Sequence, residues 1–321
     1  MPIAPDRSRV AVFGPDSLLS ITIEAQGSAD DLHVHAAGQG VWVARMAAEL
    51  GASPVLCSFL GGETGATLLP LLEGLGETRI ARTGGPSGGY VIDRRGGERR
   101  LIAATQRPAP QRHEIDDLVA GTIAAALGSA ATVVCNPYPA DGLPEEVYEV
   151  LVGDLRAAGL PVLVDLSSPR LERTLPYGPD LVKLNDWELA EYVSGPVDGP
   201  RLLEAARRLC AAGARVVVVT RGEAPIVVLP ADDEPFEIVP PRFPHGHREG
   251  CGDAMMGAIA AAWTRGLPLR EALVLGAAAG SVNFLRHGLG TGKRGTIEEL
   301  AGRIAVRPLM ADTALAPRTA A

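Results

Sequence analysis

Short runs of β-branched residues recur along the chain, and a stretch with helical periodicity follows each run at a short distance. Runs of this kind are typical of strands that are buried on both faces of a parallel sheet. The clearest runs are residues 10–13, 132–135, 161–165, 181–183 and 216–220. Residues 201–212 show the Ala-rich amphipathic pattern of the intervening helices. This alternation predicts an α/β fold with a doubly wound, mostly parallel sheet flanked by helices.

Two segments in the first third of the chain, residues 18–36 and 87–104, break this rhythm because polar and apolar residues alternate in them. Such alternation is typical of strands with one solvent-exposed face. In the second segment, the turn Arg94-Arg95-Gly96-Gly97 predicts a β-hairpin. We expect the two segments to form a small accessory sheet. Its role is either that of a lid that excludes water from a reaction or that of a homodimer surface, and one sheet can serve both.

The length of 321 residues and the 46% share of hydrophobic residues are enough for one large core. We therefore expect one domain over residues 1–310, which includes the lid strands. Residues 311–321 are small, polar and interrupted by proline, so they predict a loosely ordered tail.

Charge and cysteine content narrow the choice of partners. The formal net charge of −8 argues against nucleic acid as a partner, because nucleic-acid-binding domains usually carry clustered Lys and Arg. The four cysteines are far apart in the sequence, with no Cys-x-x-Cys pair for zinc or a redox disulfide. No apolar run approaches the length of a membrane span, so we expect a cytoplasmic protein with no membrane partner.

The segment Gly250-Cys251-Gly252-Asp253 directly precedes a helix-forming stretch of small residues. Two glycines permit close approach to backbone N–H groups, and a helix N-terminus adds unsatisfied N–H groups and the positive end of its dipole. This predicts an anion site that suits phosphate and the charge on a transferring phosphoryl group. In the first helical turn the dipole favours the ionised form of Asp253, as a base that accepts a hydroxyl proton requires. The alternative is that Asp253 simply caps a helix.

This turn resembles the second signature, Gly-Ala-Gly-Asp-Ser, of the ribokinase-like PfkB carbohydrate kinases. Four more segments resemble motifs of that family, in the family's order. They are the Gly-rich first signature at 37–45, a Gly-x-x-Gly turn at 59–65, Lys-Pro-Asn-x-x-Glu-Leu at 183–189 and a Thr-x-Gly turn at 220–222. The branch that the chain resembles most is that of the fructose 1-phosphate and tagatose 6-phosphate kinases. The resemblance implies a ribokinase-like fold and an enzyme that uses ATP and Mg²⁺ to phosphorylate a hydroxyl of a small sugar-like substrate.

The resemblance also implies roles for individual residues. Asp253 matches the catalytic base, and Gly250, Cys251 and Gly252 match the residues whose amides bind the transferring phosphoryl group. The residues that match the ATP side of the family site are Lys183, Asn185, Glu188, Thr220, Gly222, Gly280 and Asn283. For Gly280 and its small neighbours, close helix packing is an equally good explanation.

Asn185 and Glu188 match the pair that organises Mg²⁺ in the family, with water completing the coordination. Taken alone, the same residues also indicate a helix start, with Asn185 as the cap and Glu188 completing a capping box.

The substrate side departs from the family pattern. The positions that match it are Ser20, Gly38, Gln39 and Trp42. Ser20 stands where the family has an Asp that holds sugar hydroxyls, unless Asp16 substitutes for it in a shifted register. Gln39 replaces a lysine and Trp42 an asparagine. Trp42 would offer an apolar face to a sugar ring or an aromatic ligand.

Gly88 stands where the family often has a lid arginine, so the altered site lacks two of the family's cations and departs from a standard phosphosugar site. Five arginines of the lid region either compensate for them or are solvated surface charges: Arg82, Arg94, Arg99, Arg100 and Arg107. Two alternative functions stay open: a nucleoside kinase of the same superfamily, and a catalytically weak ligand-binding or regulatory member.

Overall fold

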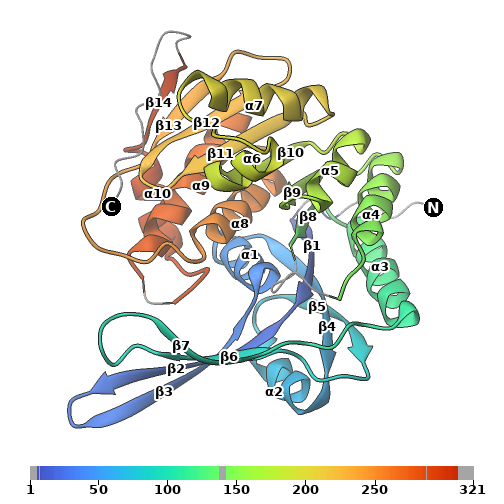
Figure 1. Ribbon diagram of the computed structural model, residues 1–321, viewed down its shortest axis with the longest axis vertical. Helices are drawn as coiled ribbons and strands as arrows, with labels where there is room; N and C mark the ends of the chain where they lie inside the picture. The colour runs from blue at the N-terminus through green and yellow to red at the C-terminus, as the bar shows by residue number, and fades with distance from the viewer. Residues whose placement is uncertain (1–5, 7, 137–141, 287, 310–321) are drawn as a thin grey trace.

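The computed structural model describes residue 6 and residues 8–136, 142–286 and 288–309. Their strands form one large sheet, with helices on both faces, and one small sheet, which lies below the large one in Figure 1. The tail expected over residues 311–321 lies outside the described residues.

Ten strands form the large sheet, and in chain order they are β1 (Arg9–Asp16), β4 (Ser53–Gly61), β5 (Glu77–Thr83), β8 (Ala131–Cys135), β9 (Val162–Asp165), β10 (Leu181–Asn185), β11 (Val216–Arg221), β12 (Ala224–Pro230), β13 (Phe236–Val239) and β14 (Ala305–Pro308). Their order in the sheet is β14-β13-β12-β11-β10-β9-β8-β1-β4-β5. All neighbours from β11 to β5 are parallel, whereas β12, β13 and β14 add antiparallel strands at one end. The mostly parallel sheet predicted from the sequence is confirmed.

Alternate residues of the central strands belong to two apolar cores, one on each face of the sheet. Val10 and Val12 of β1 join one core, whereas Ala11 and Phe13 join the other. The helices that pack in the first core are α1 (Gln39–Glu49), α2 (Gly62–Leu72), α8 (Cys251–Thr264), α9 (Leu269–Phe284) and α10 (Arg294–Ala301). Those that pack in the second are α3 (Arg112–Ala126), α4 (Glu145–Ala157), α5 (Arg170–Thr174), α6 (Asp186–Tyr192) and α7 (Pro200–Ala211), with the short 3₁₀ helix Leu175–Tyr177 beside α5.

The order of the strands reverses at β1, because β4 follows it on one side and β8 to β11 continue on the other. In open α/β sheets, ligands bind beyond the carboxyl ends of the strands at such a point. Three polar residues end strands at this edge: Asp16 in β1, Asp165 in β9 and Asn185 in β10. The topology alone therefore predicts a ligand site at this edge.

Four strands form the small sheet, in the order β3-β2-β6-β7: β2 (Leu18–Gln26), β3 (Ala29–Ala37), β6 (Gly89–Asp93) and β7 (Arg100–Thr105). Strands β6 and β7 pair antiparallel across a turn in which the Gly97 N–H donates to the Arg94 carbonyl at 2.9 Å. The expected hairpin is therefore present. Strand β2 pairs antiparallel with β3 and parallel with β6, which joins the two predicted segments into one sheet.

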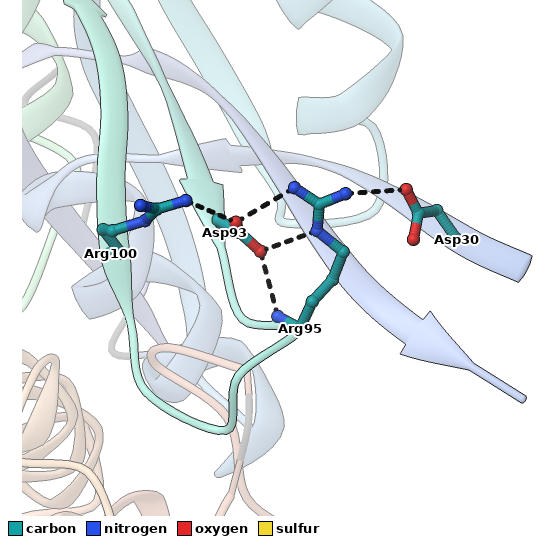
Figure 2. A network of polar contacts seen from close by, with 4 residues as sticks. All are labelled: Asp30, Asp93, Arg95 and Arg100. Atoms are coloured by element: carbon teal, nitrogen blue, oxygen red, sulfur yellow. Dashed lines mark hydrogen bonds and ion pairs between the residues drawn. The ribbon is translucent and has the colours of Figure 1, made fainter.

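An ion-pair network fastens the β6–β7 hairpin to β3 (Figure 2). Asp93, at the end of β6, accepts hydrogen bonds from the guanidinium groups of Arg95 and Arg100 at 2.9–3.0 Å. Arg95 also donates to Asp30 of β3 at 3.0 Å. The hydrogen bonds from Arg95 and then Arg100 hold the pKa of Asp93 well below its ordinary value. Arg100 is therefore engaged in holding the small sheet together.

Candidate active site

The segment Gly250-Cys251-Gly252-Asp253, called here the 250–253 turn, opens helix α8 as the sequence predicts. Gly250 is the N-cap, with a φ of +72° that disfavours residues with a side chain. Gly252 leaves room for a neighbouring side chain, because a Cβ at this position would lie 2.7 Å from Nζ of Lys183 and would force that side chain to move. The ammonium group of Lys183 therefore lies directly against the start of the helix.

Asp253 is 9% exposed and lies in the first turn of α8. Burial, and then the charge of Asp165, raise the pKa of Asp253 from 3.8 to about 7, although Lys183 and a hydrogen bond with the Gln39 side chain act in the opposite direction. The sequence predicted that the helix dipole would favour the ionised form. In the folded protein, desolvation and the like charge of Asp165 outweigh that effect.

Asp165 is a residue of this site that the sequence analysis did not single out. It is 3% exposed, and its carboxylate accepts a hydrogen bond from Nζ of Lys183 at 2.5 Å. Burial lowers the pKa of Lys183, but the charges of Asp165, Asp253 and Glu188 together raise it above its ordinary value. Lys183 is therefore a buried cation among three acidic side chains. The position of Asp165 at the carboxyl end of a buried strand was the signal that could have identified it.

Asn185 and Glu188 form the capping box that the sequence offered as one explanation. The Glu188 N–H donates to Oδ1 of Asn185 at 2.9 Å, and the Asn185 N–H donates to Oε2 of Glu188 at 2.8 Å. Burial, and then Asp165, raise the pKa of Glu188. The capping box engages one oxygen of each side chain, so this pair alone does not offer a full set of ligands for Mg²⁺. It fits a Mg²⁺ ion whose coordination is completed by water and phosphate oxygens.

A cavity of about 340 Å³ extends from the 250–253 turn along β10 and β11 to helix α9. Most residues that the sequence assigned to the ATP side lie on its wall. Those that line it are Lys183, Asn185, Thr220, Gly222 and Gly280, together with Cys251 and Gly252 of the turn. Segments that are distant in the sequence thus meet around one cavity.

Asn283 is not among the residues that line this cavity. It is 0% exposed, and its Nδ2 donates to the Glu249 carbonyl at 2.8 Å, while its Oδ1 accepts a hydrogen bond from the Thr291 N–H at 3.2 Å. Its side chain therefore ties α9 to the loop that precedes the 250–253 turn.

A second cavity, of about 350 Å³, lies between the small sheet and the loops beside α8. It is lined by Ser20 and Trp42, two of the positions assigned to the substrate, and by Arg94 and Arg99 among the lid arginines. Arg94 contacts Nε2 of His247 at 2.6 Å, and Arg99 forms an ion pair with Glu249. Arg94 and Arg99 of the β6–β7 turn thereby contact the loop immediately before the 250–253 turn.

The other predicted substrate positions and arginines lie elsewhere. Gly38, with a φ of +114°, packs its backbone against the Asp16 carbonyl, and Gln39 begins α1 and reaches Asp253. Arg107 donates to the Asp16 carboxylate at 2.9 and 3.0 Å in a buried ion pair, whereas Arg82 is exposed on β5. Neither of these arginines lines the second cavity.

Known carbohydrate kinases share sequence similarity with most of the chain. A family model described as pfkB family carbohydrate kinase matches residues 16–294. The chain is 29% identical over 291 residues to the 1-phosphofructokinase of Rhodobacter capsulatus, which covers 82% of this chain and 86% of that protein. It is 29% identical over 270 residues to the ATP-dependent 6-phosphofructokinase isozyme 2 of Mycobacterium tuberculosis H37Rv, which covers 81% and 77% of the two chains.

Solved structures show the same fold. The chain matches phosphofructokinase-2 from Escherichia coli in complex with potassium with a TM-score of 0.81 at 23% identity, over 92% of this chain and 98% of that chain. Ribokinase from Arabidopsis thaliana, complexed with ribose and ATP, matches with a TM-score of 0.71 at 19% identity, over 93% and 99% of the two chains. The expected ribokinase-like architecture is confirmed.

Within the described residues, no helix is long and apolar enough to cross a membrane.

Proposed function

The chain belongs to the pfkB family of carbohydrate kinases, and from this membership we propose that it transfers the terminal phosphoryl group of ATP to a hydroxyl of a sugar or sugar phosphate, with Asp253 as the base. The observation that carries the proposal is the position of Asp253. Asp253 is buried directly behind Gly252, which lines the cavity of about 340 Å³ and against which the Lys183 ammonium lies. Its pKa of about 7 suits a general base at neutral pH.

In the proposed reaction, the acceptor hydroxyl oxygen forms a bond to the terminal phosphorus of ATP while the bond to the bridging oxygen of ADP breaks. The hydroxyl proton passes to the Asp253 carboxylate. The N–H groups of Gly252 and Asp253 at the start of α8 and the Lys183 ammonium stabilise the negative charge on the transferring group, whereas the Cys251 N–H donates to the Arg248 carbonyl. Asn185 and Glu188 would hold Mg²⁺ through water, and the bound ion would neutralise phosphate charge.

The second cavity supports an acceptor with an anionic group. Arg94 and Arg99 line it, and an incoming phosphate would compete with their present partners, which are His247 and Glu24 for Arg94 and Glu249 for Arg99. Guanidinium groups bind phosphate through paired, charge-assisted hydrogen bonds. Trp42 also lines this cavity, and this observation favours a nucleoside as the second candidate acceptor.

The small sheet has features of a homodimer surface. Its face toward the second cavity carries polar residues such as Ser20, Thr22 and His33. Several large apolar side chains of the sheet are nevertheless exposed to solvent: Leu32 (63%), Val34 (43%), Leu101 (59%) and Ile102 (49%). Leu32 and Val34 alternate with His33 along β3, so they lie on the face that points away from the second cavity. Exposed apolar side chains that share a face mark contact surfaces, so we infer that a second copy of the chain covers this face.

The proposed reaction is tested by ADP release in the presence of ATP and Mg²⁺, with sugars, sugar phosphates and nucleosides offered separately. Asp253→Asn should reduce kcat by roughly 10²–10⁴-fold, the usual contribution of a general base. Asp198→Asn, which removes an exposed carboxylate, serves as the control. Full turnover by Asp253→Asn would refute the assigned base. Binding of ATP and an acceptor without turnover across the whole panel would favour the regulatory alternative.

A further inference from the structure

A second cation, Arg248, lines the same cavity as Lys183, and the motif assignments above give it no role. Arg248 lies two residues before Gly250, and its carbonyl accepts a hydrogen bond from the Cys251 N–H at 3.3 Å. The backbone of Arg248 is therefore tied to the first residue of α8. Its side chain is 59% exposed, so the guanidinium group is accessible to a ligand.

The guanidinium group lies near the turn that follows β11. A Cβ on Gly222 in this turn would lie 4.0 Å from Nη1 of Arg248, whereas one on Gly252 would lie 2.7 Å from Nζ of Lys183. The two cations thus lie near different segments of the cavity wall. Lys183 is at the 250–253 turn, and Arg248 is at the turn between β11 and β12. An extended polyanion such as a nucleotide polyphosphate could contact both.

Arg248 is held much more weakly than Lys183. Its Nη2 lies 3.9 Å from Oε1 of Glu223, a distance too long for a hydrogen bond, and the Glu223 side chain is 55% exposed. An exposed ion pair of this kind contributes little stability, so the guanidinium group can exchange partners at low cost. Phosphate is a stronger partner, because a guanidinium group can donate two parallel hydrogen bonds to it.

We propose that Arg248 binds the polyphosphate of the nucleotide in this cavity, and that Glu223 competes with the nucleotide for the same guanidinium group. The inference rests on the proposed function, since it requires a nucleotide in this cavity. It gives Glu223 the role of weakening nucleotide binding, both by pairing with Arg248 and by repelling phosphate charge.

Calorimetric titration of the intact protein with ATP, ADP and adenosine tests the proposal. Arg248→Ala should raise the Kd for ATP by roughly tenfold, the effect of losing charge-assisted hydrogen bonds at a half-exposed site, and should leave the Kd for adenosine unchanged. Arg242→Ala is the matched control, because Arg242 is exposed in the same loop and does not line the cavity. Thermal melting confirms that each variant is folded.

Glu223→Gln should have the opposite effect and lower the Kd for ATP by roughly two- to fivefold, with a smaller gain when Arg248 is also alanine. Unchanged ATP binding by Arg248→Ala, or equal weakening of ATP and adenosine, would overturn the proposal while leaving the kinase function intact. A wild-type protein that binds no ATP would instead overturn the proposed function, and this inference with it.

Discussion

Replacement of Asp253 by Asn should stabilise the protein at alkaline pH while it impairs catalysis. Burial and the Asp165 charge raise the pKa of Asp253 from 3.8 to about 7. Between these two values the native state binds a proton that the unfolded chain has lost, so the stabilisation from this proton is present at low pH. It disappears as the pH rises through about 7. Above that pH the fold must hold a buried carboxylate against the charge of Asp165.

The size of the effect follows from the two pKa values. A pKa change of one pH unit corresponds to about 1.4 kcal/mol. The rise from 3.8 to about 7 therefore means that the folded protein holds the ionised carboxylate at a cost of about 4 kcal/mol relative to the protonated form. Between pH 5 and pH 8 the wild type should lose roughly 2–3 kcal/mol of unfolding free energy through this group alone. The amide introduced by Asp253→Asn cannot ionise, and Lys183 keeps its partner Asp165 in the variant. The unfolding free energy of the variant should therefore rise by roughly 2–3 kcal/mol relative to that of the wild type over this range.

Urea unfolding of both proteins at pH 5 and pH 8 measures this difference. The comparison between the two proteins matters, because titrating groups that do not interact with Asp253 contribute equally to both and cancel, which leaves Asp253 and its charged neighbours Asp165, Lys183 and Glu188. Asp198→Asn controls for the removal of an exposed carboxylate. A stability difference between Asp253→Asn and wild type that is the same at the two pH values would refute the reasoning, since Asp253 would then not be a buried carboxylate with a raised pKa.

The remaining predictions concern other contacts of the site and the small sheet. The value of kcat/KM should rise with pH through about 7, as Asp253 loses its proton. Gln39→Leu should move this rise to higher pH, because it removes a hydrogen bond that lowers the pKa of Asp253. A pH–rate profile of Gln39→Leu identical to that of the wild type would contradict this. Lys183→Met should lower the unfolding free energy by about 3–5 kcal/mol because it leaves Asp165 buried without its counter-charge, and Lys183→Met with Asp165→Asn should recover much of the loss in urea unfolding. Gly252→Ala should reduce ATP turnover, because its Cβ would displace the Lys183 ammonium. Gly295→Ala in α10 is the control, because the new Cβ meets no atom within 4 Å. It should keep full turnover and raise the unfolding free energy by roughly 0.5–1 kcal/mol. Leu32→Glu should convert a homodimer to a monomer in sedimentation or gel filtration, and an unchanged dimer would place the interface elsewhere.

The elements that local sequence patterns describe were predicted correctly. The buried strands β1, β8, β9, β10 and β11 all coincide with β-branched runs, and the β6–β7 hairpin forms around its Gly-rich turn. The capping box of Asn185 and Glu188 forms because its two members are only three residues apart. The parallel strands β4 and β5 and the antiparallel strands β12 to β14 were not predicted. Strands β12 to β14 extend one end of the sheet, and their place depends on pairing with neighbours.

The sequence by itself therefore determined the α/β alternation, the strands of the small sheet and the turn that opens α8, because each depends on residues a few positions apart. Only the tertiary structure brought Asp165 to Lys183, Gln39 to Asp253, and Arg94 and Arg99 to the loop before that turn. The tertiary structure also raises the pKa of Asp253, whereas the helix dipole was expected to favour the ionised form. A helix dipole is a local property that the sequence reveals, whereas the pKa of a buried carboxylate depends on the water it loses and on charges from distant strands. Desolvation and the charge of Asp165 are the larger effects here, and they raise the pKa of the proposed base to about 7.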